Sequence, residues 1–243
     1  MHTYKKISYF VASLSLIFCM FSPAVAAEFN PNYVIADDDL TEYSAMDLAD
    51  IQDFLEKKGG YLANYVTEDT DGSIRRASEI IYRIANAYFI NPQFILALMQ
   101  KEQSLVEDPA PTDKQLDWAA GYGVCDDCTT DDPAIQRWRG FAKQVRSSSM
   151  QFREGYLTDL AQIGRTNAGL APGEATTIDG RLVIPINNAT ASLYSYTPHI
   201  EGNENMWRIW QRWFTLMYPD GALLQAQGED GVWLIQYGVK RAF

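Results

Sequence analysis

The sequence predicts a mainly α-helical protein with one small β-hairpin and a short β appendage near its C-terminus. Three observations lead to this class. Apolar residues recur at spacings of three and four along several stretches, which is the period of an amphipathic helix. Asp179-Gly180 separates two short runs of β-forming residues, a pattern typical of a tight hairpin. After Pro219-Asp220-Gly221 the chain changes to short β-like segments.

Residues 1–26 have the pattern of a secretory signal peptide. Lys5 and Lys6 precede an apolar run from Phe10 to Phe21, and Ala24-Val25-Ala26 supplies small residues for cleavage. The rival interpretation is a membrane anchor, but the apolar run is shorter than the ~20 residues that span a bilayer. We therefore expect a secreted or cell-envelope protein from which this segment is removed.

The rest of the chain is expected to form one domain over residues 27–217. The tail, residues 218–243, is too small to fold alone, and is either an appendage or the start of a truncated module. Losing Lys5 and Lys6 leaves 18 basic against 31 acidic residues, a net charge of −13. That charge predicts no nucleic-acid partner, and it disfavours adhesion to anionic wall polymers unless a local basic patch exists. We expect no membrane contact after cleavage, and a monomer.

Helix signals follow in order along the first half. Ser44 begins a helix with Asp47 in its third position, and Gly59-Gly60 ends it. A second helix follows an acidic and Gly-containing loop at Thr67–Ser73. Asn91-Pro92 then begins a third, because Asn caps free amides and Pro suits the first turn. The inward positions of the first two helices are Leu48, Ile51, Leu55, Ala77, Ile80, Ile81, Ile84, Ala85 and Tyr88.

The second half alternates loops and helices. Residues 108–133 are expected to form a long loop, and residues 134–162 a helix with Trp138, Phe141, Val145 and Phe152 facing inward. The hairpin arms are Thr176–Ile178 and Leu182–Ile184. Short helices are expected at 188–194 and 205–217. One stripe of the second helix indicates core packing in preference to sugar binding, and consists of Trp207, Trp210, Phe214 and Met217. The tail segments are 222–226 and 232–237.

Two cysteines remain in the mature chain, Cys125 and Cys128. Export favours a disulfide that staples the loop, and a C-x-x-C redox centre is the less favoured alternative. A closed zinc site needs about four ligands, and His199 is the only mature histidine. We therefore predict no metal and no cofactor.

Glu102 is the candidate for chemistry. Ile95, Leu98, Met99 and Glu102 lie at helical spacings, so the carboxyl shares a face with side chains that should be buried. Burial would raise its pKa and provide a general acid near neutral pH. Alternatively, Glu102 lies past the last buried turn and points to water.

The run Asn91 to Ser104, Asn-Pro-Gln-Phe-Ile-Leu-Ala-Leu-Met-Gln-Lys-Glu-Gln-Ser, resembles the first motif of the lysozyme-like superfamily, which includes lytic transglycosylases, muramidases and glucosaminidases. Gln103 departs from the transglycosylase pattern, in which Ser follows the glutamate directly. Ala119–Gly123 is similar to the loop that crosses the cleft in that family, and Asn188–Thr197 to its later Asn and Ala-Tyr segment. Gln-Lys-Glu-Gln-Ser-Leu, Gly-Tyr-Gly with the cysteine pair, and Tyr-Thr-Pro-His resemble an exported bacterial branch.

The resemblance implies a lysozyme-like α+β domain in which Glu102 is the general acid. Tyr122, Tyr194 and Tyr196 would line sugar subsites, each with a core aromatic as the alternative. Trp118 would stack on a sugar ring or brace its loop, and Gln103 would contact substrate. His199 is expected to be structural, since glycosidic cleavage does not require it.

The expected function is therefore cleavage of β-1,4 bonds in peptidoglycan or a related amino-sugar polymer, by hydrolysis or by a lytic transglycosylase reaction. Hydrolysis generally needs a second carboxylate opposite the acid. The sequence offers Asp117, Asp126, Asp127, Asp131 and Asp132 without choosing among them. Two other hypotheses are a non-catalytic wall-binding or surface carbohydrate-binding module of the same fold, and thiol–disulfide exchange at the cysteine pair.

Overall fold

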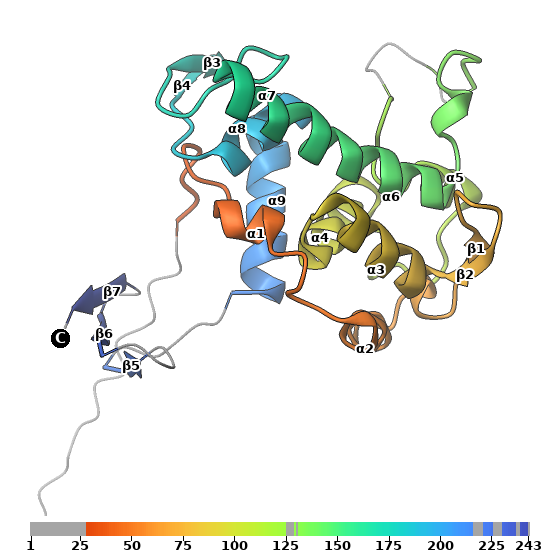
Figure 1. Cartoon of the computed structure of the whole chain (residues 1–243), viewed down its shortest axis with the longest axis horizontal. Helices are drawn as coiled ribbons and strands as arrows, with labels where there is room; N and C mark the ends of the chain where they lie inside the picture. The colour runs from red at the N-terminus through yellow and green to blue at the C-terminus, as the bar shows by residue number, and fades with distance from the viewer. Residues whose placement is uncertain are drawn as a thin grey trace, which may run out of the picture. The chain divides into compact units, whose positions relative to one another are not determined.

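The computed structural model describes residues 28–124, 129, 131–215, 221–225, 230–236 and 239–242. Contacts divide the chain into two units, a helical unit at Glu28–Leu216 and a second unit that contains the described C-terminal residues. Figure 1 shows the helical unit as a bundle of short helices with one hairpin at each of two opposite ends. The expected class, mainly α with small antiparallel hairpins, is confirmed.

The first half of the helical unit is built from helices α1 to α4 and one hairpin. Its elements are α1 (Asp37–Thr41), α2 (Leu48–Lys58), the 3₁₀ turn η1 (Tyr61–Ala63), β1 (Val66–Glu68), β2 (Ile74–Arg76), α3 (Ala77–Tyr88) and α4 (Pro92–Gln103). Thr67–Ser73, expected as a loop, contributes residues to the β1–β2 hairpin, in which Val66 pairs with Arg76 and Glu68 with Ile74.

The second half contains helices α5 to α9 and the second hairpin. Its elements are α5 (Asp113–Asp117), the 3₁₀ turn η2 (Gln136–Trp138), α6 (Phe141–Met150), the π-helical segment η3 (Gln151–Leu157), α7 (Thr158–Ile163), β3 (Thr176–Ile178), β4 (Arg181–Val183), α8 (Asn188–Tyr196) and α9 (Ile200–Trp213). In the part of the chain that the structure describes, no helix has the length and apolarity needed to cross a membrane.

Helix α4 occupies the centre of the core, as its apolar sequence predicts. Every residue from Phe94 to Met99 is buried, and α4 packs against α3 and α9. Asn91 caps the helix as expected, because its Oδ1 accepts from the Gln93 amide at 2.8 Å and Pro92 occupies the first turn. The central position of α4 fixes where its last turn, and therefore Glu102, meets the surface.

Helix α2 begins later than predicted. Its N-cap is Asp47, whose Oδ1 accepts from the Asp50 amide at 2.8 Å while Asp50 accepts from the Asp47 amide at 3.0 Å. Ser44 instead bonds to Glu42 outside the helix. This reciprocal pair satisfies two amides at once, which explains why it outcompetes Ser44 as the start. Gly59, with φ of 70°, ends the helix as expected.

Residues 134–162 do not form one helix. Gly140, at φ 115°, separates η2 from α6, so Trp138 lies outside the helix and only partly buried. Phe141, Val145 and Phe152 are buried as expected. The β3–β4 hairpin turns at Asp179-Gly180 as predicted, with φ of 48° and 74°, and its second arm begins one residue early.

Helix α9 begins at Ile200, five residues before the predicted start, because Asp179 of the β3–β4 turn accepts from the Ile200 amide at 2.7 Å. Its aromatic residues pack into the core. Trp210 is buried, and Phe214 lies 5.0 Å from Trp210 and 5.3 Å from Phe54 between ring centroids. Of the predicted stripe, Met217 lies outside the described residues.

The C-terminal unit is a three-stranded antiparallel sheet in the order β5 (Leu223–Gln225), β6 (Val232–Gln236) and β7 (Val239–Ala242). The sequence predicted the first two segments and missed the third. Strand β7 pairs with β6 in the register Trp233 with Ala242 and Gln236 with Val239. The short link between β6 and β7 gave no clear turn signal beyond a single glycine.

Candidate functional site

Glu102 lies in the last turn of α4, where the core meets the surface. Ile95, Leu98 and Met99 on the same face are buried as predicted, while the Glu102 side chain keeps 22% of its exposed area. The helix ends at Gln103, and its C-cap residue, Ser104, adopts a left-handed conformation with φ of 54°. The carboxylate is therefore neither sealed in the core nor free in solvent.

Lys101 is the partner that sequence reasoning missed. Its Nζ lies 2.6 Å from Glu102 Oε1 and also donates to Thr197 Oγ1 at the end of α8. The Lys101 side chain is only 3% exposed, and its ammonium lies 5.8 Å from the centroid of the Tyr196 ring. A buried ammonium requires a partner. The signal was present, since a lysine directly beside the acid interrupts an otherwise apolar helix.

Gly121 closes over the other carboxylate oxygen. A Cβ added at this position would lie 2.8 Å from Glu102 Oε2, and the backbone has φ of 67°. The small-residue loop at Ala119–Gly123 therefore meets Glu102. Only glycine combines this close approach with a left-handed conformation at little cost.

Replacement of Gly121 by alanine tests this contact. We expect Gly121→Ala to lower the free energy of unfolding by about 2 kcal/mol, because a steric clash is added to an unfavourable φ. Gly164→Ala is the matched control, since Gly164 has φ of 79° and nothing within 4 Å of an added Cβ. Urea unfolding would show a clearly larger loss for Gly121→Ala; equal losses would mean that the contact with Glu102 has no energetic weight.

Tyr196 lies beside the ion pair. Its hydroxyl donates to the Ala120 carbonyl at 2.8 Å, and its ring stacks on Phe152 with centroids 4.9 Å apart. Burial, and then the negative charge of Glu102, raise the pKa of Tyr196 well above its usual value. The phenol therefore stays protonated and serves as a fixed donor that ties α8 to the Gly121 loop.

Tyr122 is held by a residue that the sequence did not single out. The buried Gln144 of α6 accepts from the Tyr122 amide at 2.9 Å and donates to the Tyr122 carbonyl at 3.0 Å. The ring packs edge-to-face on Trp138, with centroids 5.5 Å apart. Burial and the neighbouring Tyr122 raise the pKa of Tyr156 to about 12. Tyr122, Tyr156 and Tyr196 thus form one cluster behind Glu102.

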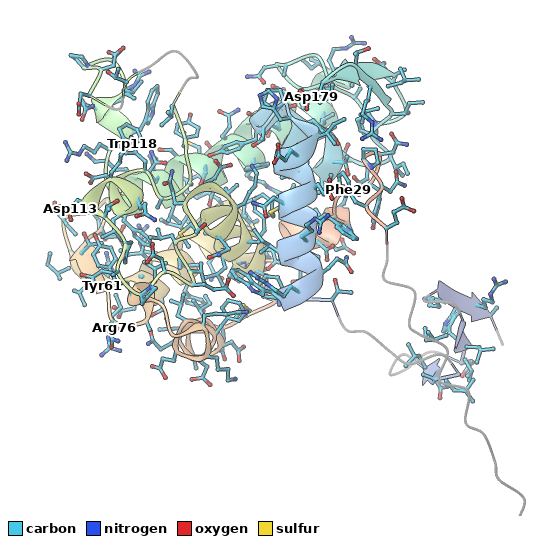
Figure 2. All side chains as sticks on the ribbon, turned by 180° about the vertical axis from the view of Figure 1, so that it is seen from behind. Phe29, Tyr61, Arg76, Asp113, Trp118 and Asp179 are labelled. Atoms are coloured by element: carbon cyan, nitrogen blue, oxygen red, sulfur yellow. The ribbon has the colours of Figure 1, made fainter. Side chains whose placement is uncertain are left out.

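Two predicted ligand-binding aromatics belong to the core. Tyr194 is 0% exposed, and its hydroxyl has no hydrogen-bond partner in the described part of the chain. Burial raises its pKa to about 12. Trp118, labelled in Figure 2, is also buried and follows α5, so it braces its loop instead of offering a stacking face. The burial of Tyr194 and Trp118 matches the alternatives that the sequence left open for them, a core aromatic and a brace of the loop.

The remaining predicted positions are scattered. Gln103 is partly buried, and its carbonyl accepts from Gln115 Nε2 at 3.0 Å. Asp117 pairs with Arg139 at 2.7 Å, and Asp132 accepts from the Ala134 amide. Four further candidates, the cysteine pair with its expected disulfide and two acids, lie outside the described residues: Cys125, Cys128, Asp126 and Asp127.

A surface pocket adjoins the ion pair through Thr197. This α9 pocket has a volume of about 700 Å³ and is lined by Thr197, His199, Glu201, Gly202, Glu204 and Arg208. A Cβ added at Gly202 would lie 2.7 Å from Thr197 Cγ2 and 3.7 Å from Lys101 Cε, so the floor of the pocket rests against the ion pair.

The rim of the α9 pocket is polar. His199 Nδ1 lies 3.0 Å from Asp179 Oδ1, at the position labelled in Figure 2 where α9 begins. The Ile200 amide and then His199 lower the pKa of Asp179. His199 therefore joins the start of α9 to the β3–β4 turn. Within the ranges described, no group of three or more His, Cys, Asp or Glu side chains is placed to hold a metal ion.

Comparison with known proteins gives one match. A family model described as "LasA, N-terminal domain" matches residues 33–227, which is four-fifths of the chain. No curated protein and no solved structure matches the chain. The matched range covers nearly all of the helical unit and the first strand of the C-terminal sheet.

This match overturns the resemblance to the lysozyme-like superfamily. The residues of these motifs, Glu102, Gly121 and Tyr196, do lie together in the structure. The family model that covers them, however, does not describe glycan-cleaving enzymes. The expected activity as a glycosidase or lytic transglycosylase was therefore wrong, and so was the alternative of a carbohydrate-binding module with that fold. The motifs were misleading because an apolar helix can also end on an acid for a structural reason. Here the acid forms an ion pair where the core meets the surface.

Proposed function

The chain belongs to the family of LasA N-terminal domains, and from this we propose that it is an exported accessory domain of a peptidoglycan-cleaving peptidase of the LasA type. The match over residues 33–227 carries the proposal. Its target is then the peptide part of peptidoglycan, not the sugar backbone. The signal pattern at residues 1–26 supports an extracytoplasmic location.

We propose further that the domain acts by binding the peptidase itself. The chain carries a net charge of −11. Such a charge disfavours general adhesion to anionic wall material, but it is compatible with a specific protein interface. The α9 pocket is the surface best suited to hold a polar segment of the partner. It offers the carboxylates of Glu201 and Glu204, the Thr197 hydroxyl, and a floor fixed by Lys101.

The proposal predicts a direct complex. Mature chain mixed with a LasA-type peptidase domain should elute as a one-to-one complex, with the accessory chain itself monomeric when alone. Purified peptidoglycan treated with the mixture should release new amino groups and no new reducing sugar ends. Reducing ends released by this chain alone would contradict the proposal, and so would a failure of the two proteins to associate at any tested concentration.

A charge-reversal pair locates the interface. Glu201→Lys combined with Glu204→Lys should weaken the complex about ten-fold or more. The two new lysines remove any ion pair that the glutamates form with the partner, and they repel positive charges on it. Glu154→Lys with Glu174→Lys is the matched control, since both residues are exposed and lie outside the α9 pocket. Isothermal titration measures both pairs, and equal weakening would remove the α9 pocket from the proposal.

A further inference from the structure

A basic groove lies on the helical unit near the β1–β2 hairpin, away from the α9 pocket. It has a volume of about 350 Å³ and is lined by Arg137, Trp138, Lys143, Arg146, Thr70 and Ser147. Figure 1 shows that β1–β2 and β3–β4, which mark these two regions, lie at opposite ends of the bundle. Among the residues that the structure describes, no carboxylate lines this groove, although the chain as a whole has 31 acidic and 20 basic residues.

The three cations of the groove are available to a ligand. In the ranges that the structure describes, Arg137, Lys143 and Arg146 make no ion pair, and all three side chains are exposed. Lys143 and Arg146 are three residues apart on α6 and so lie on one face. By contrast, Arg75 and Arg83 on the neighbouring hairpin and α3 are neutralised by the buried Asp69. Positive charge thus accumulates in the groove.

The groove is held in shape before any ligand binds. The Arg137 guanidinium carbon lies 4.0 Å from the centroid of the Trp138 ring, which is close enough for a cation–π interaction. Trp138 is in turn fixed by Tyr122 and by Gly123, where an added Cβ would lie 2.4 Å from Trp138 Cε3. On the opposite wall, Thr70 accepts a hydrogen bond from Arg83 at 3.1 Å. Fixed donors lose less entropy on binding than mobile ones.

The groove continues beyond a single anion-sized hollow. An adjoining hollow of about 220 Å³ shares Thr70 and Lys143 and adds Arg139, which already pairs with Asp117. Glu68 and Asp69 also line it, but Asp69 is already paired with two arginines. The two hollows adjoin each other and share Lys143. They therefore suit a linear ligand with a charge on each repeat better than they suit a single carboxylate or ion.

We propose that this basic groove binds a linear phosphodiester polymer of the cell envelope, of the poly(glycerol phosphate) type. Guanidinium groups match phosphate oxygens in geometry, and lysine adds a point charge. A nucleic acid fits less well, because Arg137 already covers a face of Trp138 on which a base would stack. This proposal goes beyond the proposed function and does not depend on the peptidase partner.

Binding of purified poly(glycerol phosphate) to the mature chain tests the proposal by tryptophan fluorescence at low and moderate salt. Lys143→Gln with Arg146→Gln should weaken binding about ten-fold or more at low salt, and should reduce the slope of log affinity against log salt by about two. Lys114→Gln with Arg181→Gln is the control, since it removes the same charge from an exposed lysine and an exposed arginine outside both the groove and the α9 pocket. The control should stay within about two-fold of the unchanged protein.

Several outcomes would overturn this assignment. They are no binding at low salt, equal weakening by the control pair, and tighter binding of polygalacturonate or oligothymidylate at matched charge. Lys143 and Arg146 are exposed and unpaired among the described residues, so unfolding midpoints should be unchanged in the variant pair. A loss of binding in that pair therefore reports on the groove and not on folding.

Discussion

Glu102→Gln is expected to lower the free energy of unfolding by about 2–3 kcal/mol, and the melting temperature by roughly 5–10 °C. The reason is Lys101, whose ammonium lies 2.6 Å from Glu102 Oε1 and whose side chain is 3% exposed. Without the carboxylate, that ammonium keeps only uncharged partners among the described residues: the Thr197 hydroxyl, the Tyr196 ring and the new amide. An uncompensated buried charge costs more than the pair contributes when intact.

The reverse substitution should be milder. Lys101→Met keeps the buried stem and leaves Glu102, whose side chain is 22% exposed and can gain water. We expect a loss of about 1 kcal/mol for this variant. In the double variant the two uncharged side chains should recover part of the Glu102→Gln loss, giving a coupling energy of about 1–2 kcal/mol.

Urea unfolding of the two single variants and the double variant measures this cycle. Equal losses in the single variants, with no coupling, would show that the Lys101–Glu102 ion pair at the end of α4 contributes nothing to stability. The same cycle separates a structural acid from a reactive one, because a catalytic glutamate can usually be replaced by glutamine without loss of stability.

Asp69→Asn is the second substitution with a large expected effect, a loss of roughly 2–4 kcal/mol in the free energy of unfolding. The Asp69 carboxylate is 0% exposed and pairs with Arg75 and Arg83, which joins the β1–β2 hairpin to α3. The asparagine leaves Arg83 without a charged partner among the described residues, and leaves Arg75 with only the exposed Asp71. Asp71→Asn is the control, because Asp71 also pairs with Arg75 but is exposed.

Asp69 should also make stability depend on pH. Burial alone would raise its pKa, but hydrogen bonds from Arg83 and Thr70 and the charges of Arg83 and Arg75 outweigh burial and lower it. The stabilisation is therefore complete above the unfolded value, about pH 4, and is lost as the pH falls through the folded-state pKa.

Unfolding midpoints measured from pH 6 down to pH 2 should fall less steeply for Asp69→Asn than for the unchanged protein. Parallel profiles would mean that the pKa of Asp69 is the same in the folded and unfolded states. The pairing of Asp69 with Arg75 and Arg83 would then contribute nothing to stability. Because Thr70 follows Asp69 directly, the same variant should also loosen one wall of the basic groove.

The sequence by itself determined the positions of α2, α3, α4 and α8 and where the strongest helix ends lie, but it missed the short helices α1 and α5. Asn91-Pro92 begins α4, Gly59 ends α2 and Asp179-Gly180 turns the β3–β4 hairpin, all as predicted. These features are local: caps, left-handed glycines and apolar periodicity act within a few residues of each other. The apolar face that leads to Glu102 is a local feature of the same kind.

Only the tertiary structure decided what those segments do together. Lys101 finds Thr197 far along the chain, and Gly121 closes over the Glu102 carboxylate. Tyr194 turns into the core while Tyr196, two residues later, reaches the Gly121 loop. Arg137, Lys143 and Arg146 gather in a groove beside Thr70 although the chain is acidic. Pairing across the fold depends on where separate elements pack, and no spacing within one element encodes that.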